Sequence, residues 1–254
     1  MRTGSMDTDA RAGRWVLALM AVVAIAAGIY YGWQRQPAET VPEPVVEHPI
    51  ETPEAPPLPA LADSDAEVLV ALDGLSGDGR IESLLIPEGI VRRITATVDN
   101  LSREKVATRI RAVRPMEQPF VAGGDDAAPV LGPDNYARYA AQVRLVESLD
   151  VDQVVAVYVR LYPLFQEAYE ELGNPTTYFN DRVIEVIDHL LDAPEIRGEI
   201  PLRRPSVMYQ FADPGLEARS AGQKLLIRMG PENAARIKAW LRGLRGRLAN
   251  QPPA

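Results

Sequence analysis

The residues with the clearest capacity for chemistry lie in one segment, residues 178–191, with the sequence YFNDRVIEVIDHLL. Its acidic residues Asp181, Glu185 and Asp188 are spaced so that a helix would bring three carboxylates onto one face, with His189 beside them. Such a group could bind a divalent cation or act as general acid and base. We therefore treat these four residues as the candidate catalytic group. The candidate binding residues around them are Tyr178, Phe179, Asn180 and Arg182.

A plainer interpretation of the same segment is a solvated helix face. Asn180 or Asp181 would then cap the helix, and Arg182 would pair with Glu185. His189 would have to be the base of any Ser-His-Asp triad, because the other histidine lies in a proline-rich stretch. A single histidine on an amphipathic helix is more often structural than catalytic, so this interpretation favours a protein that is not an enzyme.

The composition excludes several familiar chemistries. The chain has no cysteine, so it has no disulfide, no thiolate nucleophile and no cysteine-based metal site. With one histidine in the globular part, multi-histidine metal centres and zinc fingers are excluded as well. The sequence contains no G-x-S-x-G, P-loop or complete G-x-G-x-x-G motif. It therefore predicts neither a metal centre nor a cofactor.

Two groups of cations suggest a different kind of site. Arg92 and Arg93 begin a basic stretch with few acids, and they are further candidate binding residues. Residues 231–248 are also basic and follow a Gly-Pro break, which invites a nucleic-acid interpretation. The mildly acidic charge of the domain argues against nucleic-acid binding. The export of the domain, which the N-terminal residues described next predict, argues against it as well. An anionic envelope polymer, a lipid headgroup or an acidic partner suits these cations better, and a solvated face is the simplest alternative.

An apolar run near the N-terminus predicts a membrane anchor. Residues 15–34, WVLALMAVVAIAAGIYYGWQ, contain no charged residue, and a helix of this length spans a hydrocarbon core of about 30 Å. The excess of arginine in residues 1–14 places that segment in the cytoplasm and the rest of the chain outside it. We expect a single-pass membrane protein that contacts the lipid bilayer through residues 15–34 and has an exported C-terminal domain. A cleavable signal peptide is the alternative.

The segment after the anchor predicts a spacer. Residues 35–60 form a Pro/Glu-rich linker, with eight prolines between residues 36 and 59. Proline fixes the backbone and removes hydrogen-bond donors, so we expect an extended segment that reaches up to about 75 Å. Residues 61–249 then form a soluble, mainly helical domain, and residues 250–254 a disordered tail.

Apolar periodicity outlines the elements of this domain. A capping box at Ser64 opens the first helix, which Gly74 ends, and an irregular loop covers residues 109–132 with a short strand at 120–121. The remaining helices are expected at 87–101, 133–149, 150–172, 180–192, 220–229 and 231–248, and a small hairpin at 199–203 and 207–211. The aromatic stripe of the helix expected at 150–172, Tyr158, Tyr162, Phe165 and Tyr169, is most simply core packing, and a ligand groove is the alternative. The fold class is therefore mainly α: a transmembrane helix, a Pro-rich linker and a helical bundle with a minor β-hairpin.

Four stretches of the domain resemble a known family. They are SDAEV (64–68), VRRITATVDNL (91–101), YFNDRVIEVIDHLL (178–191) and SAGQKLLIRMGPENAARIK (220–238). They are similar to an uncharacterised proteobacterial family of exported single-pass proteins with a domain of unknown function, over roughly residues 61–248. The resemblance implies a location in the Gram-negative envelope and implies no activity, cofactor or catalytic residue.

Three functions follow as hypotheses. The first is a membrane-anchored periplasmic module that binds an envelope protein or a cell-wall component. The second is an envelope hydrolase or transferase that uses the carboxylates around Asp181. The third is a nucleic-acid-binding protein, which requires the reverse topology.

Overall fold

The computed structural model describes residue 50 and residues 57–250 of the chain. The expected cytoplasmic segment, the apolar run at 15–34, most of the linker and all but the first residue of the tail lie outside the described residues. Within the part that is described, no helix is both long enough and apolar enough to cross a membrane. We refer to residues 57–250 as the head.

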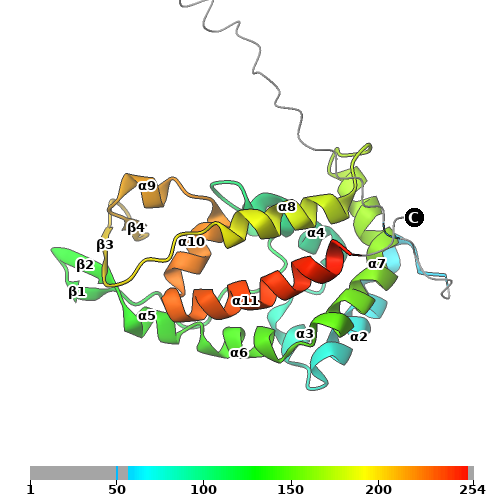
Figure 1. Cartoon of the computed structure of the whole chain (residues 1–254), viewed down its shortest axis with the longest axis horizontal. Coiled ribbons are helices and arrows are strands. Elements are labelled where there is room, and N and C mark those ends of the chain that lie inside the picture. The colour runs from blue at the N-terminus through cyan, green and yellow to red at the C-terminus, as the bar shows by residue number, and fades with distance from the viewer. Residues whose placement is uncertain (1–49, 51–56, 251–254) are drawn as a thin grey trace, which may run out of the picture. The chain divides into compact units, whose positions relative to one another are not determined.

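The head is mainly helical and carries a small antiparallel sheet (Figure 1). The α-helices are α2 (Asp65–Ser76), α3 (Arg80–Leu84), α4 (Ile90–Leu101), α5 (Pro133–Ala137), α6 (Ala140–Ser148), α7 (Val151–Glu171), α8 (Phe179–Leu191), α9 (Pro214–Glu217), α10 (Ala221–Arg228) and α11 (Pro231–Leu248). Two short 3₁₀ turns are η1 (Leu61–Asp63) and η2 (Thr108–Ile110). The strands are β1 (Gly123–Asp125), β2 (Ala128–Leu131), β3 (Ile200–Arg203) and β4 (Gln210–Phe211).

The largest apolar core lies between α2, α4, α7 and α8. Phe165 of α7 stacks on Phe179 of α8 with ring centroids 5.8 Å apart. Tyr162 and Tyr169 are also buried in this core, and Tyr158 packs against it, so the aromatic stripe of α7 is core packing. This packing fixes how α8 is rotated, and therefore which of its side chains reach the surface.

The head begins before the expected end of the linker. Ile50 is 5% exposed and belongs to the same apolar core as Leu61. Leu58 packs against that core as well. Apolar side chains from the C-terminal part of the Pro/Glu-rich segment therefore bury surface in the main core of the head.

The sheet is larger than the expected hairpin. The pairing of β3 with β4 is confirmed, with Leu202 opposite Phe211. However, β1 and β2 form a second hairpin inside the expected irregular loop, and β2 pairs with β3 to give the strand order β1-β2-β3-β4. The strand expected at residues 120–121 is absent from the described residues, and β1 begins at Gly123 instead. The sheet lies at one end of the head (Figure 1).

Three local expectations were wrong for identifiable reasons. The Oγ of Ser64 donates to the carbonyl of Leu61 and does not cap α2. Gly74 lies inside α2, which ends at Ser76 before the left-handed Gly77. The helix expected at 133–149 is divided into α5 and α6 near Arg138 and Tyr139.

Candidate functional site

The start of α8 is fixed by residues of α7. The side-chain amide of Gln166 accepts from the backbone N–H of Phe179 at 2.8 Å and donates to the carbonyl of Thr177 at 3.0 Å. Gln166 therefore supplies the acceptor for the first backbone N–H of α8. The N-cap residue Tyr178 makes no such side-chain hydrogen bond. Phe179 and Asn180 are buried and unavailable to a large ligand, whereas Tyr178 stays partly exposed.

Arg182 is the centre of a half-buried ionic group. Its Nε donates to Oδ1 of Asp99 at 2.9 Å, and its Nη2 donates to the carbonyl of Asp99 and to Oγ of Ser102, both at 2.7 Å. Glu185 pairs with Arg182 at 2.6 Å, as expected of a solvated helix face. Burial opposes the charge of Arg182, but the two carboxylates outweigh it and raise the pKa of the guanidinium.

Asp188 turns away from this group toward α11. Both of its carboxylate oxygens accept from Arg245, one of them from Nη2 at 2.8 Å. The same contact raises the pKa of Arg245 above its ordinary value. Glu185 and Asp188 therefore belong to different ion pairs. Glu185 pairs with Arg182, which lies on α8 and contacts Asp99 of α4, whereas Asp188 pairs with Arg245 of α11.

His189 and Asp181 have separate surroundings. The Nε2 of His189 lies 2.8 Å from the Oγ of Ser220, which also accepts from the backbone N–H of Gln223 and so caps α10. The side chain of Gln223 donates to the carbonyl of His189, which closes a small network between α8 and α10. Asp181 lies near the aromatic core: burial chiefly raises the pKa of Tyr158, and the charge of Asp181 adds to this effect.

The candidate catalytic residues thus share a helix but not a site. In the described residues, no three or more histidine, aspartate or glutamate side chains come together in a way that could hold a metal ion. The Ser220–His189 pair has the spacing of a nucleophile and its base, yet Ser220 is buried and its hydroxyl already caps a helix.

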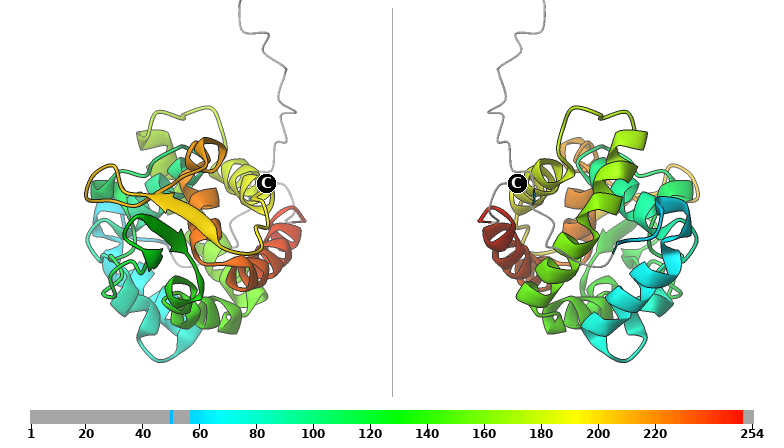
Figure 2. Two further views of the ribbon diagram at one scale, coloured as in Figure 1. Left: turned by 90° about the vertical axis from the view of Figure 1, so that its left-hand side faces the viewer. Right: turned by 90° about the vertical axis from the view of Figure 1, so that its right-hand side faces the viewer.

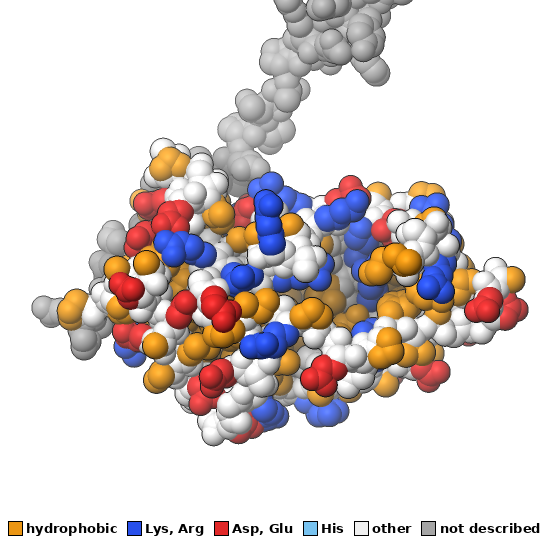
Figure 3. Space-filling model, turned by 180° about the vertical axis from the view of Figure 1, so that it is seen from behind, with side chains coloured by type: hydrophobic (Ala, Val, Ile, Leu, Met, Phe, Trp, Pro, Cys, Tyr) orange, Lys and Arg blue, Asp and Glu red, His pale blue; other side chains and the backbone are white. Residues whose placement is uncertain are grey.

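Both groups of cations are largely engaged within the head. Arg92 forms a two-pronged ion pair with Glu171, at 2.6 and 2.8 Å. Arg93 donates to the carbonyls of Glu88 and Arg109. On α11, the ion pairs are Arg236 with Glu147, Arg245 with Asp188 and Arg247 with Asp152, and the buried Lys238 donates to the carbonyl of Ala193. Figure 3 shows charges of both signs interspersed with apolar side chains over one face of the head.

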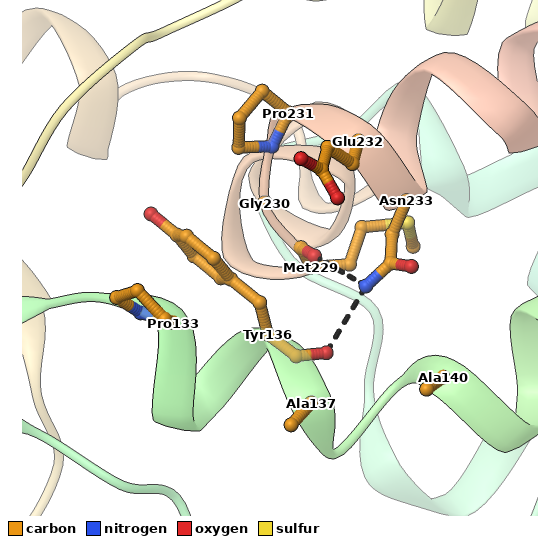
Figure 4. A pocket seen from close by; sticks show the side chains of 9 residues that line it. All are labelled: Pro133, Tyr136, Ala137, Ala140, Met229, Gly230, Pro231, Glu232 and Asn233. Carbon is orange, nitrogen blue, oxygen red and sulfur yellow. Dashed lines mark hydrogen bonds between the residues drawn. The ribbon is translucent and has the colours of Figure 1, made fainter.

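A shallow pocket of about 410 Å³ lies where α10 meets α11, beside α5 (Figure 4). The side-chain amide of Asn233 spans its floor, donating to the carbonyls of Tyr136 and Met229 at 3.0 and 2.9 Å. The ring of Tyr136 packs against Gly230, where a Cβ would lie 2.4 Å from Cγ of the ring. Burial raises the pKa of the Tyr136 phenol above its ordinary value. The Gly-Pro break in the sequence locates this corner, but the periodicity gives no sign of a pocket.

Comparison with known proteins gives one family match. The chain matches a family model described as "Protein of unknown function (DUF3014)" over residues 90–245, from the first residue of α4 almost to the end of α11. This chain belongs to the DUF3014 family. The matched region contains the whole sheet and α8. Neither the curated proteins nor the solved structures contain a match to the chain.

Proposed function

We propose that this DUF3014 protein is an inner-membrane-anchored periplasmic module whose head binds an envelope protein or a cell-wall component and performs no chemistry. The observation that carries the proposal is the separation of the α8 carboxylates into different ion pairs, with Glu185 on Arg182 and Asp188 on Arg245. A general acid and base must converge on one reacting group. Asp188 instead holds α8 against α11, and Glu185 pairs within α8 with the arginine that contacts Asp99 of α4.

The sequence outside the head supports the location. The uncharged run at 15–34 has arginine on its N-terminal side, and the segment after it is rich in proline and glutamate. A head at the end of such a tether can reach a partner at a distance from the bilayer. The lipid bilayer is then the first partner, and nucleic acid is excluded by compartment.

The experiment replaces two carboxylates by amides of nearly the same size and shape, which removes the negative charge alone. Full-length protein with Asp181→Asn and Glu185→Gln is expressed in cells that lack the native chain, and photo-crosslinked partners are compared with those of the unaltered protein. We expect the same partners and full rescue of any growth defect caused by the deletion. Loss of rescue with an unchanged crosslinking pattern and an unchanged melting temperature would show that the carboxylates perform a reaction.

An envelope hydrolase is the second candidate, and the contact between His189 and Ser220 is the observation that favours it. Ser220→Ala separates the two functions. A binding module loses only the helix cap, about 1 kcal/mol of folding stability, and keeps its partners. A hydrolase built on this pair loses its activity and its reaction with an organophosphate or sulfonyl fluoride probe.

A further inference from the structure

The outer face of the small sheet is exposed, with Asp125, Ala128, Pro201 and Arg203 at the surface. Its inner face packs Leu131, Leu202 and Phe211 against Ile227 of α10 in a separate apolar core. Side chains alternate along each strand, so the next residues along point outward. In Figure 2 (left) the strands face the viewer and the helices lie behind them.

The register places opposite charges in one row across this outer face. Asp125 of β1 is opposite Ala128 of β2. On the other side of β2, Val130 is opposite Pro201 of β3 and Leu131 is opposite Ile200. The same antiparallel register, continued by two residues, brings Arg203 of β3 beside Ala128. Asp125 and Arg203 therefore lie one strand away from Ala128 in opposite directions, each about 5 Å from it. Oδ1 of Asp125 accepts from the backbone N–H groups of Ala127 and Ala128, at 2.9 and 2.8 Å, which holds the carboxylate at the turn and leaves its second oxygen for a partner. All three are exposed.

The neighbouring residues extend both charges and add apolar surface. Asp126 follows Asp125 at the turn, and Arg204 follows Arg203. The loop after them exposes Val207 and Met208, at 79% and 70% of their full surface. Figure 3 shows acidic side chains at the sheet end of the head, with apolar and basic ones beside them. Because both signs are present, the surface as a whole repels neither an acidic nor a basic partner.

We propose that the outer face of the sheet binds a second copy of this chain. A two-fold axis through Ala128 turns one row onto the other so that each Asp125 meets the Arg203 of the other copy. This is the self-complementarity that a symmetric dimer requires. An anionic lipid surface fits less well, because Asp125 and Asp126 would face the phosphates. Addition of a strand at β4 is blocked, because the backbone N–H of Phe211 already donates to Glu217 at 2.9 Å.

The first experiment uses the absence of native cysteine. Ala128→Cys in the full-length protein, treated in membranes with a short bis-maleimide crosslinker, is expected to give a crosslinked dimer, because the axis brings the two cysteines to about 10 Å, the spacing of two sheets packed face to face. The control is Val70→Cys on α2, which is 75% exposed and lies outside the sheet. A yield of dimer from Ala128→Cys no higher than that from the control would overturn the proposal.

The second experiment exchanges charges at positions that have no other role. Arg203 and Asp126 make no side-chain hydrogen bond or ion pair among the described residues, so Arg203→Glu and Asp126→Arg should leave the melting temperature unchanged. In the first variant the new carboxylate faces Asp125 of the other copy, and in the second a cation lies one residue from the Asp125 that meets Arg203. We expect the Ala128→Cys dimer of either variant alone to fall about tenfold. Differently tagged copies of the two variants should crosslink to each other at the original yield. Equal crosslinking in all combinations, or none when the variants are mixed, would overturn the proposal.

Discussion

Arg182 on α8 and Asp99 on α4 form the most enclosed ion pair of the head, with 15% and 11% of their side chains exposed. The two residues are far apart in the sequence and join two helices that also share the main apolar core. Ser102 and Glu185 complete the acceptors around the guanidinium. The pair therefore fixes α8 against α4 at the point where the sequence suggested a catalytic site.

Removing the cation should cost more than removing an exposed neighbour. Arg182→Ala leaves Asp99 enclosed without its main partner, and we expect the free energy of unfolding to fall by about 3 kcal/mol in urea titrations. Arg103→Ala is the matched control: Arg103 also pairs with Asp99 but is 63% exposed, and its loss should cost less than about 1 kcal/mol. An equal loss of unfolding free energy in the two variants would show that the enclosed ion pair stabilises the fold no more than the exposed one.

A second long-range contact fixes the start of α4. The carboxylate of Asp65 on α2 accepts from the backbone N–H groups of Gly89 and Ile90 at 2.8 and 2.9 Å. Asp65→Ala should lower the free energy of unfolding by about 2 kcal/mol, because two N-terminal donors of α4 lose their acceptor. Asp63→Ala nearby removes an exposed carboxylate and should change stability by less than about 0.5 kcal/mol. A comparable loss for both would contradict the capping role.

These contacts explain which features the sequence could predict. The starts of two helices follow from local signals at the positions expected for helices 150–172 and 220–229: the side chain of Asp150 caps α7 through the N–H of Gln153, and Ser220 caps α10 in the same way. The hairpin of β1 and β2 was missed because Gly123, Gly124 and Pro129 hide the alternation of a strand.

The partners of the α8 side chains could not be predicted in the same way. Carboxylates spaced along one helix predict a shared face, but they do not say which distant residues meet that face. Arg245 and Asp99 lie far from α8 in the sequence, and only the packing of the helices brings them to Asp188 and Arg182. An apparent catalytic cluster in the sequence is therefore a set of separate interhelical contacts in the structure.

The tyrosines of α7 predict an alkaline instability. Burial chiefly raises the pKa of Tyr162 to about 12, and that of Tyr158 well above its ordinary value. An unfolded tyrosine ionises near pH 10, so the folded state binds more protons above that pH. The contribution of the protonated Tyr162 to the free energy of unfolding is complete below about pH 10. It should be lost as the pH rises toward about 12, where the folded protein must also ionise this phenol. Urea titrations across this range, with tyrosinate absorbance followed in parallel, measure it.

Two substitutions on α7 sharpen this prediction. The buried hydroxyl of Tyr158 has no hydrogen-bond partner within the described part of the chain, so Tyr158→Phe should stabilise the fold by about 1 kcal/mol and reduce the alkaline loss. The hydroxyl of Tyr162 lies 3.1 Å from Gln166, and Tyr162→Phe should cost about 1 kcal/mol. Alkaline behaviour that is unchanged in both variants would mean that these phenols do not control it.

Replacing two glycines of α11 by alanine should change the stability of the fold in opposite directions. Gly230 is the N-cap residue of this helix and Gly246 lies near its end. Gly230 has a φ of 84° and no room for a Cβ beside Tyr136, so Gly230→Ala should destabilise the fold by more than about 2 kcal/mol. Gly246 lies within α11 with nothing within 4 Å of an added Cβ, so Gly246→Ala should stabilise by about 0.5–1 kcal/mol. Thermal unfolding distinguishes the two. Tolerance of alanine at residue 230 would contradict the tight corner.

The central claim is that the head lies on the periplasmic side of the inner membrane, because an envelope protein or a cell-wall component is within reach only there. Val70→Cys, the only cysteine in such a chain, offers a well-exposed thiol on the head. Thr3→Cys offers one in the segment expected in the cytoplasm. A membrane-impermeant maleimide added to intact spheroplasts should label the residue-70 variant and leave the residue-3 variant unlabelled until the cells are lysed. Labelling of residue 3 before lysis, with residue 70 protected, would contradict the account.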